Sequence, residues 1–223
     1  MKKRTFSRRK PLLFLLCLLL VGVIATGSSL AYLHAMTRDY QNAFSLAGED
    51  LRARLTEPNW DAAEGLKLVP GKTIRKDPIV TNTSKNQSEY VAMRVTFLGS
   101  GGTPFGSADL LRLLNLMKIH GLDSQWVLCQ GTYTVTAGSV ATVTQPLIFY
   151  YNQPIAPSEV TDPLFTGLRV QNKYDSVNAM TEADLNWLKF LGTIEIRLEG
   201  AAVDAASFAN AAAAASTLVG LFP

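Results

Sequence analysis

Residues 91–97 read VAMRVTF, and this stretch decides the fold class. Apolar side chains at 91, 93, 95 and 97 alternate with Ala, Arg and Thr, a period of two that is typical of a half-buried β-strand. A polar turn over 82–88 precedes it, and residues 73–83 before that turn are extended in character. We therefore expect 73–83 and 91–97 to form two antiparallel strands joined by a loop.

Further strands are expected on both sides of this pair. Residues 51–55 alternate Leu, Ala and Leu with two arginines, and Pro58-Asn59 stops them. Residues 126–135 and 139–151 are rich in Val, Thr, Tyr, Phe and Ile, and Ala137-Gly138-Ser139 between them predicts a hairpin. Residues 193–199 alternate strictly, with Ile194, Ile196 and Leu198 facing inward.

Helices are expected between and after the strands. Residues 107–118 carry apolar side chains at helical spacing, with Ser107 as the cap, Lys118 and His120 near the C-terminus, and Gly121 in the left-handed conformation. Asp162-Pro163 predicts a short helix through 168, and 204–218 a terminal helix. Because strands and helices do not alternate as βαβ units, the pattern predicts a mainly β protein. The specific expectation is an antiparallel β-sandwich of jelly-roll type with helical insertions and a C-terminal helix.

The N-terminal 31 residues have the pattern of a cleavable secretory signal peptide. Six Lys and Arg residues lie within residues 2–10, an uninterrupted apolar run covers 12–24, and Ser29-x-Ala31 is a small-residue cleavage site. A membrane anchor needs about 20 apolar residues, and Thr26 to Ser29 break this run earlier. We therefore expect cleavage between Ala31 and Tyr32, and a secreted protein with a β-sandwich domain over 49–223.

Removal of residues 1–31 reverses the sign of the charge. The chain has 21 basic and 18 acidic residues, and losing six basic ones leaves 15 against 18, a formal net charge of −3. The mature chain has no basic stripe interleaved with aromatic residues, so nucleic-acid binding is not indicated. Cys17 lies in the signal peptide, which leaves Cys129 without a partner in its own chain. We expect Cys129 to be buried in a strand.

No motif in the chain predicts catalysis, a cofactor or a metal ion. The two histidines, His34 and His120, are far apart in sequence and do not form the H-E-x-x-H motif. Gly99-Ser100-Gly101-Gly102 has proline where the third glycine of a dinucleotide motif is needed, so it is interpreted as a strand-to-helix connection. The acidic residues that remain are scattered, and the sequence does not choose between solvated loops and a carboxylate or calcium site: Asp61, Glu64, Asp77, Glu89, Asp175, Glu182 and Asp184.

Four segments, in order, resemble one family of exported proteins. Residues 30–48, LAYLHAMTRDYQNAFSLAG, resemble the region cleaved by a SipW-type signal peptidase, with matches at Ala31, Tyr32, Asn42, Phe44 and Gly48. Residues 55–61 read LTEPNWD, and residues 68–97 resemble a strand pair of that family, with its P-G-x-x-x-x-K-D motif at 70–77. Residues 167–175 and 192–214 resemble the closing strand and tail. On these segments the chain resembles the TasA/camelysin family, although its Ala-rich C-terminus and residues 99–157 depart from the family pattern.

The resemblance implies a secreted, structural subunit of extracellular biofilm-matrix fibres from a Gram-positive bacterium. It implies self-assembly head to tail, a SipW-type peptidase during export, and an accessory matrix protein as a further partner. In such fibres an extended N-terminal segment adds a strand to the next subunit. By position that segment is 32–48 here, with Tyr32, Leu33, Tyr40, Phe44 and Leu46 as its apolar residues.

Two other functions stay open on the sequence. Proteins resembling camelysin have been classed as metalloendopeptidases, which makes an extracellular metallopeptidase the first alternative. The second is a monomeric cell-surface or adhesion module, in which residues 32–48 are a disordered tail.

Overall fold

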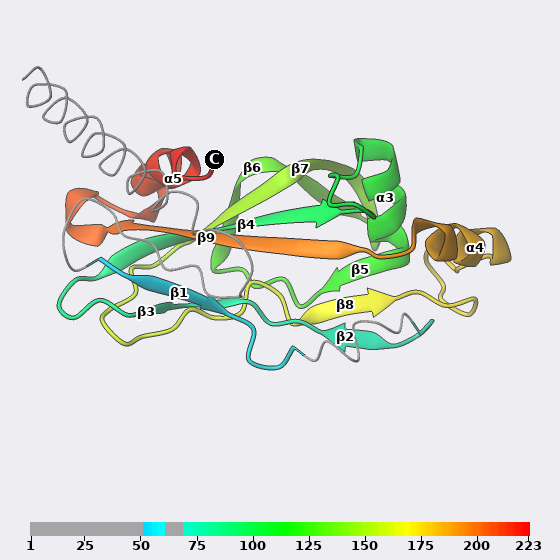
Figure 1. Cartoon of the computed structure of the whole chain (residues 1–223), viewed down its shortest axis with the longest axis horizontal. Coiled ribbons are helices and arrows are strands. Elements are labelled where there is room, and N and C mark those ends of the chain that lie inside the picture. Colours follow the sequence, from blue (N-terminus) through cyan, green and yellow to red (C-terminus); the bar gives the residue numbers. More distant parts are fainter. Residues whose placement is uncertain (1–50, 61–68) are drawn as a thin grey trace, which may run out of the picture. The chain divides into compact units, whose positions relative to one another are not determined.

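The structure, a computed structural model that describes residues 51–60 and 69–223, has more strand than helix (Figure 1). The strands are β1 (Ala53–Thr56), β2 (Thr73–Arg75), β3 (Ile79–Asn82), β4 (Glu89–Leu98), β5 (Met117–His120), β6 (Trp126–Thr136), β7 (Ser139–Tyr151), β8 (Gly167–Val170) and β9 (Glu195–Asp204). The helices are α3 (Ser107–Leu116), α4 (Glu182–Leu191) and α5 (Ala211–Gly220), with a 3₁₀ turn at Ala205–Ser207. The expected mainly β, antiparallel class is confirmed.

The strands form three sheets in two layers. One layer is a four-stranded sheet in the order β6-β7-β4-β9. The other contains a three-stranded sheet, β2-β8-β5, and a two-stranded pair, β1-β3. Every pairing recorded between the described strands is antiparallel. No parallel crossover therefore connects the described strands, in agreement with the absence of βαβ alternation in the sequence.

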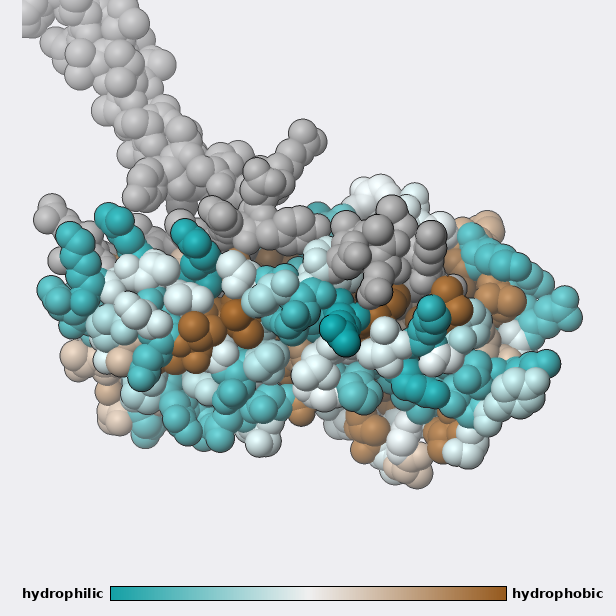
Figure 2. All heavy atoms as spheres, turned by 90° about the horizontal axis from the view of Figure 1, so that it is seen from below, coloured by the Kyte–Doolittle hydropathy of each residue, from teal (hydrophilic) through white to brown (hydrophobic). Residues whose placement is uncertain are grey.

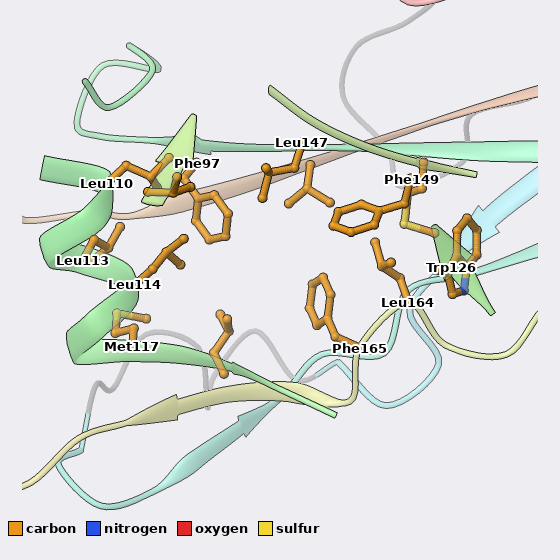
Figure 3. Close-up of a cluster of buried hydrophobic side chains, with 14 of the residues drawn as sticks. Phe97, Leu110, Leu113, Leu114, Met117, Trp126, Leu147, Phe149, Leu164 and Phe165 are labelled. Carbon is orange, nitrogen blue, oxygen red and sulfur yellow. The ribbon is translucent and has the colours of Figure 1, made fainter. Parts of the chain in front are cut away.

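The main core lies between the two layers. Figure 3 shows Phe97, Leu147 and Phe149 of the four-stranded sheet facing Leu164, Phe165 and Met117 on the other side. Helix α3 closes the core at one end with Leu110, Leu113 and Leu114, all at most 1% exposed. A smaller cluster lies on the outer face of the four-stranded sheet, where Ala211, Ala214 and Leu218 of α5 pack on it.

Helix α5 explains why β4 is buried on both faces rather than one. Ala92 is 0% exposed although the alternation predicted that it faces solvent. Ala92 and Ala201 belong to the cluster that α5 covers, and their small side chains allow a helix to pack closely on the sheet. The helix begins at Ala211, with Asn210 Oδ1 accepting from Ala213 N–H at 2.9 Å, and not at Asp204 as expected.

The expected pairing of 73–83 with 91–97 is wrong. The first segment forms two strands, β2 and β3, which belong to the other layer. Strand β3 pairs with β1, whereas β7 and β9 occupy both edges of β4. No edge of β4 is therefore left for β3, and the 83–88 loop crosses between the layers.

Three helix predictions also need correction. Helix α3 ends at Leu116, and Lys118 and His120 lie in strand β5, because Met117–His120 pairs with β8. Gly106, not Ser107, occupies the N-cap of α3. Residues 167–170 form the central strand of the three-stranded sheet instead of a helix, with Leu168 and Val170 buried. Gly121 does have the predicted left-handed backbone, φ +67°, but it follows a strand.

The predicted hairpin and the 51–55 strand are confirmed. Strands β6 and β7 join through Ala137 and Gly138, whose φ values are +50° and +78°. In β1 and its approach, Leu51, Ala53 and Leu55 are at most 5% exposed, while Arg52 and Arg54 are exposed. Cys129, in contrast, lies in edge strand β6 but is exposed, because the register shifts between Leu128 and Gln130. The expectation that it is buried is wrong.

Candidate functional site

The LTEPNWD segment and the P-G-x-x-x-x-K-D segment meet in one buried cluster. Lys76 Nζ lies 2.6 Å from Glu57 Oε1 and 2.9 Å from Glu57 Oε2. The Lys76 and Glu57 side chains are only 5% and 4% exposed. Residue 57 belongs to the LTEPNWD segment and residue 76 to P-G-x-x-x-x-K-D, so contact between these two motifs is a finding of the structure.

Three more residues complete the cluster. The Nζ of Lys76 lies 4.5 Å from the centre of the Trp60 ring, a cation–π contact. Asp77 Oδ1 accepts from Asn59 N–H at 2.9 Å, and Asp77 Oδ2 accepts from Asn59 Nδ2 at 2.6 Å. We call these five residues the clamp: Glu57, Asn59, Trp60, Lys76 and Asp77.

Local sequence places the two halves of the clamp. Strand β1 is held on the core by its buried apolar side, and Pro58-Asn59 turn the chain immediately after it, with Trp60 N–H donating to Glu57 O at 3.2 Å. Lys76 and Asp77 lie between β2 and β3, followed by Pro78. The clamp therefore joins the end of β1 to the corner between the two-stranded and three-stranded sheets.

The electrostatics of the clamp reflect its burial. Desolvation raises the pKa of Glu57 above its ordinary value, and this outweighs the attraction of Lys76, which lowers it. A carboxylate in such a place is stable only when a positive charge accompanies it. Lys76 and Asp77 thus each have a defined partner, and the arrangement holds chain segments together.

A second polar cluster holds the opposite end of β1. Arg52 N–H donates to Ser84 Oγ at 2.7 Å and to Glu89 Oε1 at 3.0 Å, and Thr83 N–H donates to Arg52 O at 2.8 Å. Ser84 Oγ also donates to Glu89 Oε1. We call Ser84 and Glu89 the latch. Glu89 is 0% exposed, and its Oε2 has no hydrogen-bond partner among the described residues.

Burial also sets the ionisation of the latch. Desolvation raises the pKa of Glu89, while its hydrogen bonds from Ser84 and the Arg52 backbone act in the opposite direction. Asn82 supports the latch, since its Oδ1 accepts from Ser84 N–H at 2.8 Å and its Nδ2 donates to Ile155 O at 2.9 Å. Both ends of the four-residue strand β1 are therefore fixed by buried polar side chains.

The residues expected to carry function from the sequence fall into two groups. The cleavage pair Ala31 and Tyr32 and the candidate donor residues Leu33, Tyr40, Phe44 and Leu46 lie outside the described residues, as do His34, Asp61 and Glu64. Of the scattered carboxylates, Asp77 belongs to the clamp and Glu89 to the latch. Asp175 pairs with Arg169, and Asp184 pairs with Arg112 and caps α4.

Among the scattered carboxylates that the structure describes, none is brought together with others as a metal site. Within residues 51–60 and 69–223, no group of three or more His, Cys, Asp or Glu side chains is placed to hold an ion. His120 is exposed on β5, and its Nδ1 lies 3.2 Å from Thr166 Oγ1. In the same ranges, no helix has both the length and the apolar character needed to cross a bilayer.

Sequence reasoning singled out the two motifs of the clamp but not their contact. Glu57 and Lys76 carry opposite charges next to buried strand residues, and this is the only signal that pointed to a pair. The sequence signal for the latch was weaker: it is only that an acidic residue, Glu89, comes directly before the apolar run of β4. The Asn59–Asp77 contact of the clamp and the Arg52–Glu89 contact of the latch join residues 18 and 37 positions apart, so only the fold reveals them.

Comparisons with known proteins give this chain no relative. No protein-family model matches it, and neither does any curated protein or solved structure.

Proposed function

We propose that this protein is a secreted structural subunit of extracellular matrix fibres, of the TasA/camelysin type. Its domain is a jelly-roll sandwich. Residues 32–48 of one copy form the donor strand that completes the sheet of the next copy in the fibre. Export and cleavage after Ala31 by a SipW-type peptidase release this segment. The subunit acts without a cofactor, and an accessory matrix protein is its second partner.

The observation that carries this proposal is the fixing of β1 at both ends. Strand β1 is the first described strand after the proposed donor segment, so a pull on residues 32–48 reaches the domain through it. The latch holds Arg52 before β1, and the buried Lys76–Glu57 pair holds the chain after it. A subunit that transmits force along a fibre needs such an anchor, and the half of the anchor after β1 joins two of the four segments that resemble the family.

Edge strands provide the physical basis for strand donation. Strands β6 and β9 are the edges of the four-stranded sheet, and an edge strand offers backbone groups to an incoming segment. Register shifts near Cys129 and Gly131 disrupt the β6 ladder, which is a common way to prevent pairing at an edge. Strand β9 has no register shift in its pairing with β4 and is the more regular of the two edges.

Electron microscopy of two purified chains tests the proposal. One chain starts at residue 32 and the other at Gly48, and both are concentrated under the same conditions. We expect filaments from the first and monomers from the second. Monomers from both would refute assembly through residues 32–48 and would favour a surface module. Chelator-sensitive proteolysis by the purified protein would favour the peptidase alternative.

A further inference from the structure

One face of the three-stranded sheet carries basic side chains from all three of its strands. Strands β2, β8 and β5 lie side by side in this order, and both pairings are antiparallel (Figure 1). Ile74, Leu168 and Ile119 are opposite one another in the register and lie in or against the main core. Because side chains alternate along a strand, the residues on either side of these three face away from the core. We call four of the outward residues the basic face: Arg75, Lys118, His120 and Arg169.

Two cations of the basic face, Arg169 and Lys118, lie directly opposite each other in the register of β8 and β5. Like charges in this position destabilise a sheet. Asp175 offsets part of this cost, because its Oδ1 lies 2.9 Å from Arg169 Nη2. The hydrogen bond from Arg169 lowers the pKa of Asp175, and the charge of Lys118 adds a smaller effect in the same direction. The chain thus holds one of its own carboxylates against these two cations.

The other two residues of the basic face, Arg75 and His120, are exposed, and Gly167 of the central strand lies between them in the register. Neighbouring strands are about 4.8 Å apart, so the backbones of Arg75 and His120 are separated by about 10 Å. A Cβ at Gly167 would clash with Ile74 O, so the close approach of β2 requires glycine here. The central strand is therefore bare between these two cations, and a ligand that crosses it can reach both.

Most of the positive charge on and beside this face is unpaired. Neither Arg75 nor Lys118 has an ion-pair partner among the residues that the structure describes. The same is true of two exposed lysines at the end of the sheet where β2 begins and β8 ends, Lys72 and Lys173. Asp175 therefore neutralises only one of the charges in this region.

The other acids around the three-stranded sheet have local roles of their own. Asp77, after β2, belongs to the clamp and is only 8% exposed. Asp123, after β5, accepts from Gln125 N–H at 2.7 Å. Asp109 and Glu182 stand in the first turns of α3 and α4, where the helix dipole favours an acid. No ion pair between any of these four and the basic face is recorded.

The neighbouring two-stranded pair has basic residues that acids accompany. Arg52 and Arg54 are exposed just before and on β1, and Lys85 is exposed in the 83–88 loop. Segment 159–164 runs beside β3 and brings two exposed acids, Glu159 and Asp162, to this part of the layer. The basic face of the three-stranded sheet is thus the part of this layer in which bases most outnumber acids among the described residues.

We propose that the basic face binds an acidic polysaccharide, a chain of sugars that carries carboxylate groups. Charge complementarity requires an anionic ligand, and Asp175 shows that a carboxylate fits beside Arg169 and Lys118. The remaining outward residues of the three strands, Thr73 and Gly167, add no aromatic or aliphatic surface on which bases could stack or lipid could pack. Several weak contacts along one polymer chain then add up to useful affinity. This activity goes beyond the proposed fibre function and does not depend on it.

Binding of polygalacturonate to the chain that starts at residue 32 tests the proposal. The polymer is immobilised, and interferometry measures bound protein, with neutral dextran as the blank. We expect saturable binding that falls by about tenfold or more for Arg75→Glu/Lys118→Glu, because attraction becomes repulsion. Lys189→Glu/Arg197→Glu changes the net charge equally at exposed positions of α4 and β9 and should bind like the unaltered chain. Salt of about 1 M, where the Debye length is about 3 Å, should abolish binding.

The variants and ligands together separate the possible results. Circular dichroism first confirms that the variants are folded, and Arg75→Gln/Lys118→Gln replaces the charge reversal if that protein unfolds. No binding by the unaltered chain, or equal losses for the two double variants, would overturn the proposal. Tighter binding of duplex DNA or of anionic lipid vesicles, lost in Arg75→Glu/Lys118→Glu, would also overturn it by assigning the face to another polyanion. Electron microscopy of the same samples reports filaments separately, so polysaccharide binding without filaments would refute the fibre function and leave the basic face intact.

Discussion

The ammonium group of Lys76 contacts two other residues of the clamp, Glu57 and Trp60. It pairs with both carboxylate oxygens of Glu57 and lies against Trp60 while being almost inaccessible to water. A buried charge of this kind contributes little net stability when paired but is costly when one partner is removed. The clamp therefore determines how firmly the end of β1 is fixed.

Replacing Lys76 with Met should destabilise the domain strongly at neutral pH. It leaves the Glu57 carboxylate buried without a counter-ion, and we expect the free energy of unfolding to fall by about 3–5 kcal/mol in a urea titration. The loss should shrink as pH falls, because protonated Glu57 needs no partner. Arg197→Met, which removes the half-exposed pair with Glu195, is the matched control and should cost under about 1 kcal/mol.

A second change distinguishes the ion pair from simple packing. Adding Glu57→Gln to Lys76→Met removes both charges, and it should recover much of the lost stability. Equal losses for Lys76→Met and Arg197→Met would contradict the view that the clamp is a buried, coupled pair.

The latch predicts a pH dependence with a defined sign. Burial raises the pKa of Glu89 in the folded protein above its unfolded value, so the ionised form is disfavoured by folding. Below the unfolded pKa both states are protonated and this cost is absent; it appears as pH rises through the raised pKa. Glu89→Gln keeps the acceptor for Arg52 N–H and should be more stable than the unaltered chain at pH 8.

Urea titrations across pH measure this difference directly. The advantage of Glu89→Gln should vanish near pH 4, and exposed Glu159→Gln should show no comparable trend. A constant difference across the pH range, or a less stable Glu89→Gln protein at pH 8, would exclude a role for the raised pKa.

Among the elements, the β6-β7 hairpin has the simplest local control. Its two-residue turn needs positive φ at both positions, and Ala137 occupies one of them at +50°. Asn tolerates this conformation better than Ala, and Asn-Gly is the preferred pair for such a turn. Ala137→Asn should therefore raise the free energy of unfolding by up to about 1 kcal/mol, whereas Gly138→Ala should lower it. If thermal unfolding shows the opposite order, the turn geometry is wrong.

The sequence predicted the elements whose rules are local. The hairpin, β1, the alternation of β9 and the helix at 107–116 follow from apolar spacing and turn residues. The predicted pairing of β3 with β4 was wrong because β7 (139–151) and β9 (195–204) already occupy both edges of β4. The order of strands becomes visible only in the complete sheet. Lys118 and His120 were interpreted as the end of a helix. The alternation of Met117 and Ile119 with these two polar residues equally predicted the strand that the structure shows.

Helix α4 and the clamp show the other limit of sequence reasoning. Helix α4 was not expected, although Thr181 followed three residues later by Asp184 was a detectable cap signal. The clamp depends on two segments whose meeting is set by the pairing of β1 with β3. That pairing is non-local, and no spacing in the sequence encodes it.

At the scale of the molecule, β1 connects the domain to everything that precedes it. The latch and the clamp fix it at both ends. Figure 2 shows that on the face seen there hydrophobic groups are scattered among hydrophilic ones. Assembly is therefore expected to depend on strand donation more than on a broad apolar surface.

Binding of a donor peptide tests the central claim most directly. A labelled peptide of residues 32–47 is titrated with the chain that begins at Gly48, and fluorescence anisotropy reports complex formation. The account predicts saturable one-to-one binding that is lost when Tyr40, Phe44 and Leu46 of the peptide are replaced by Asp. No binding, or equal binding of the two peptides, would contradict donation of residues 32–48 to a neighbouring subunit.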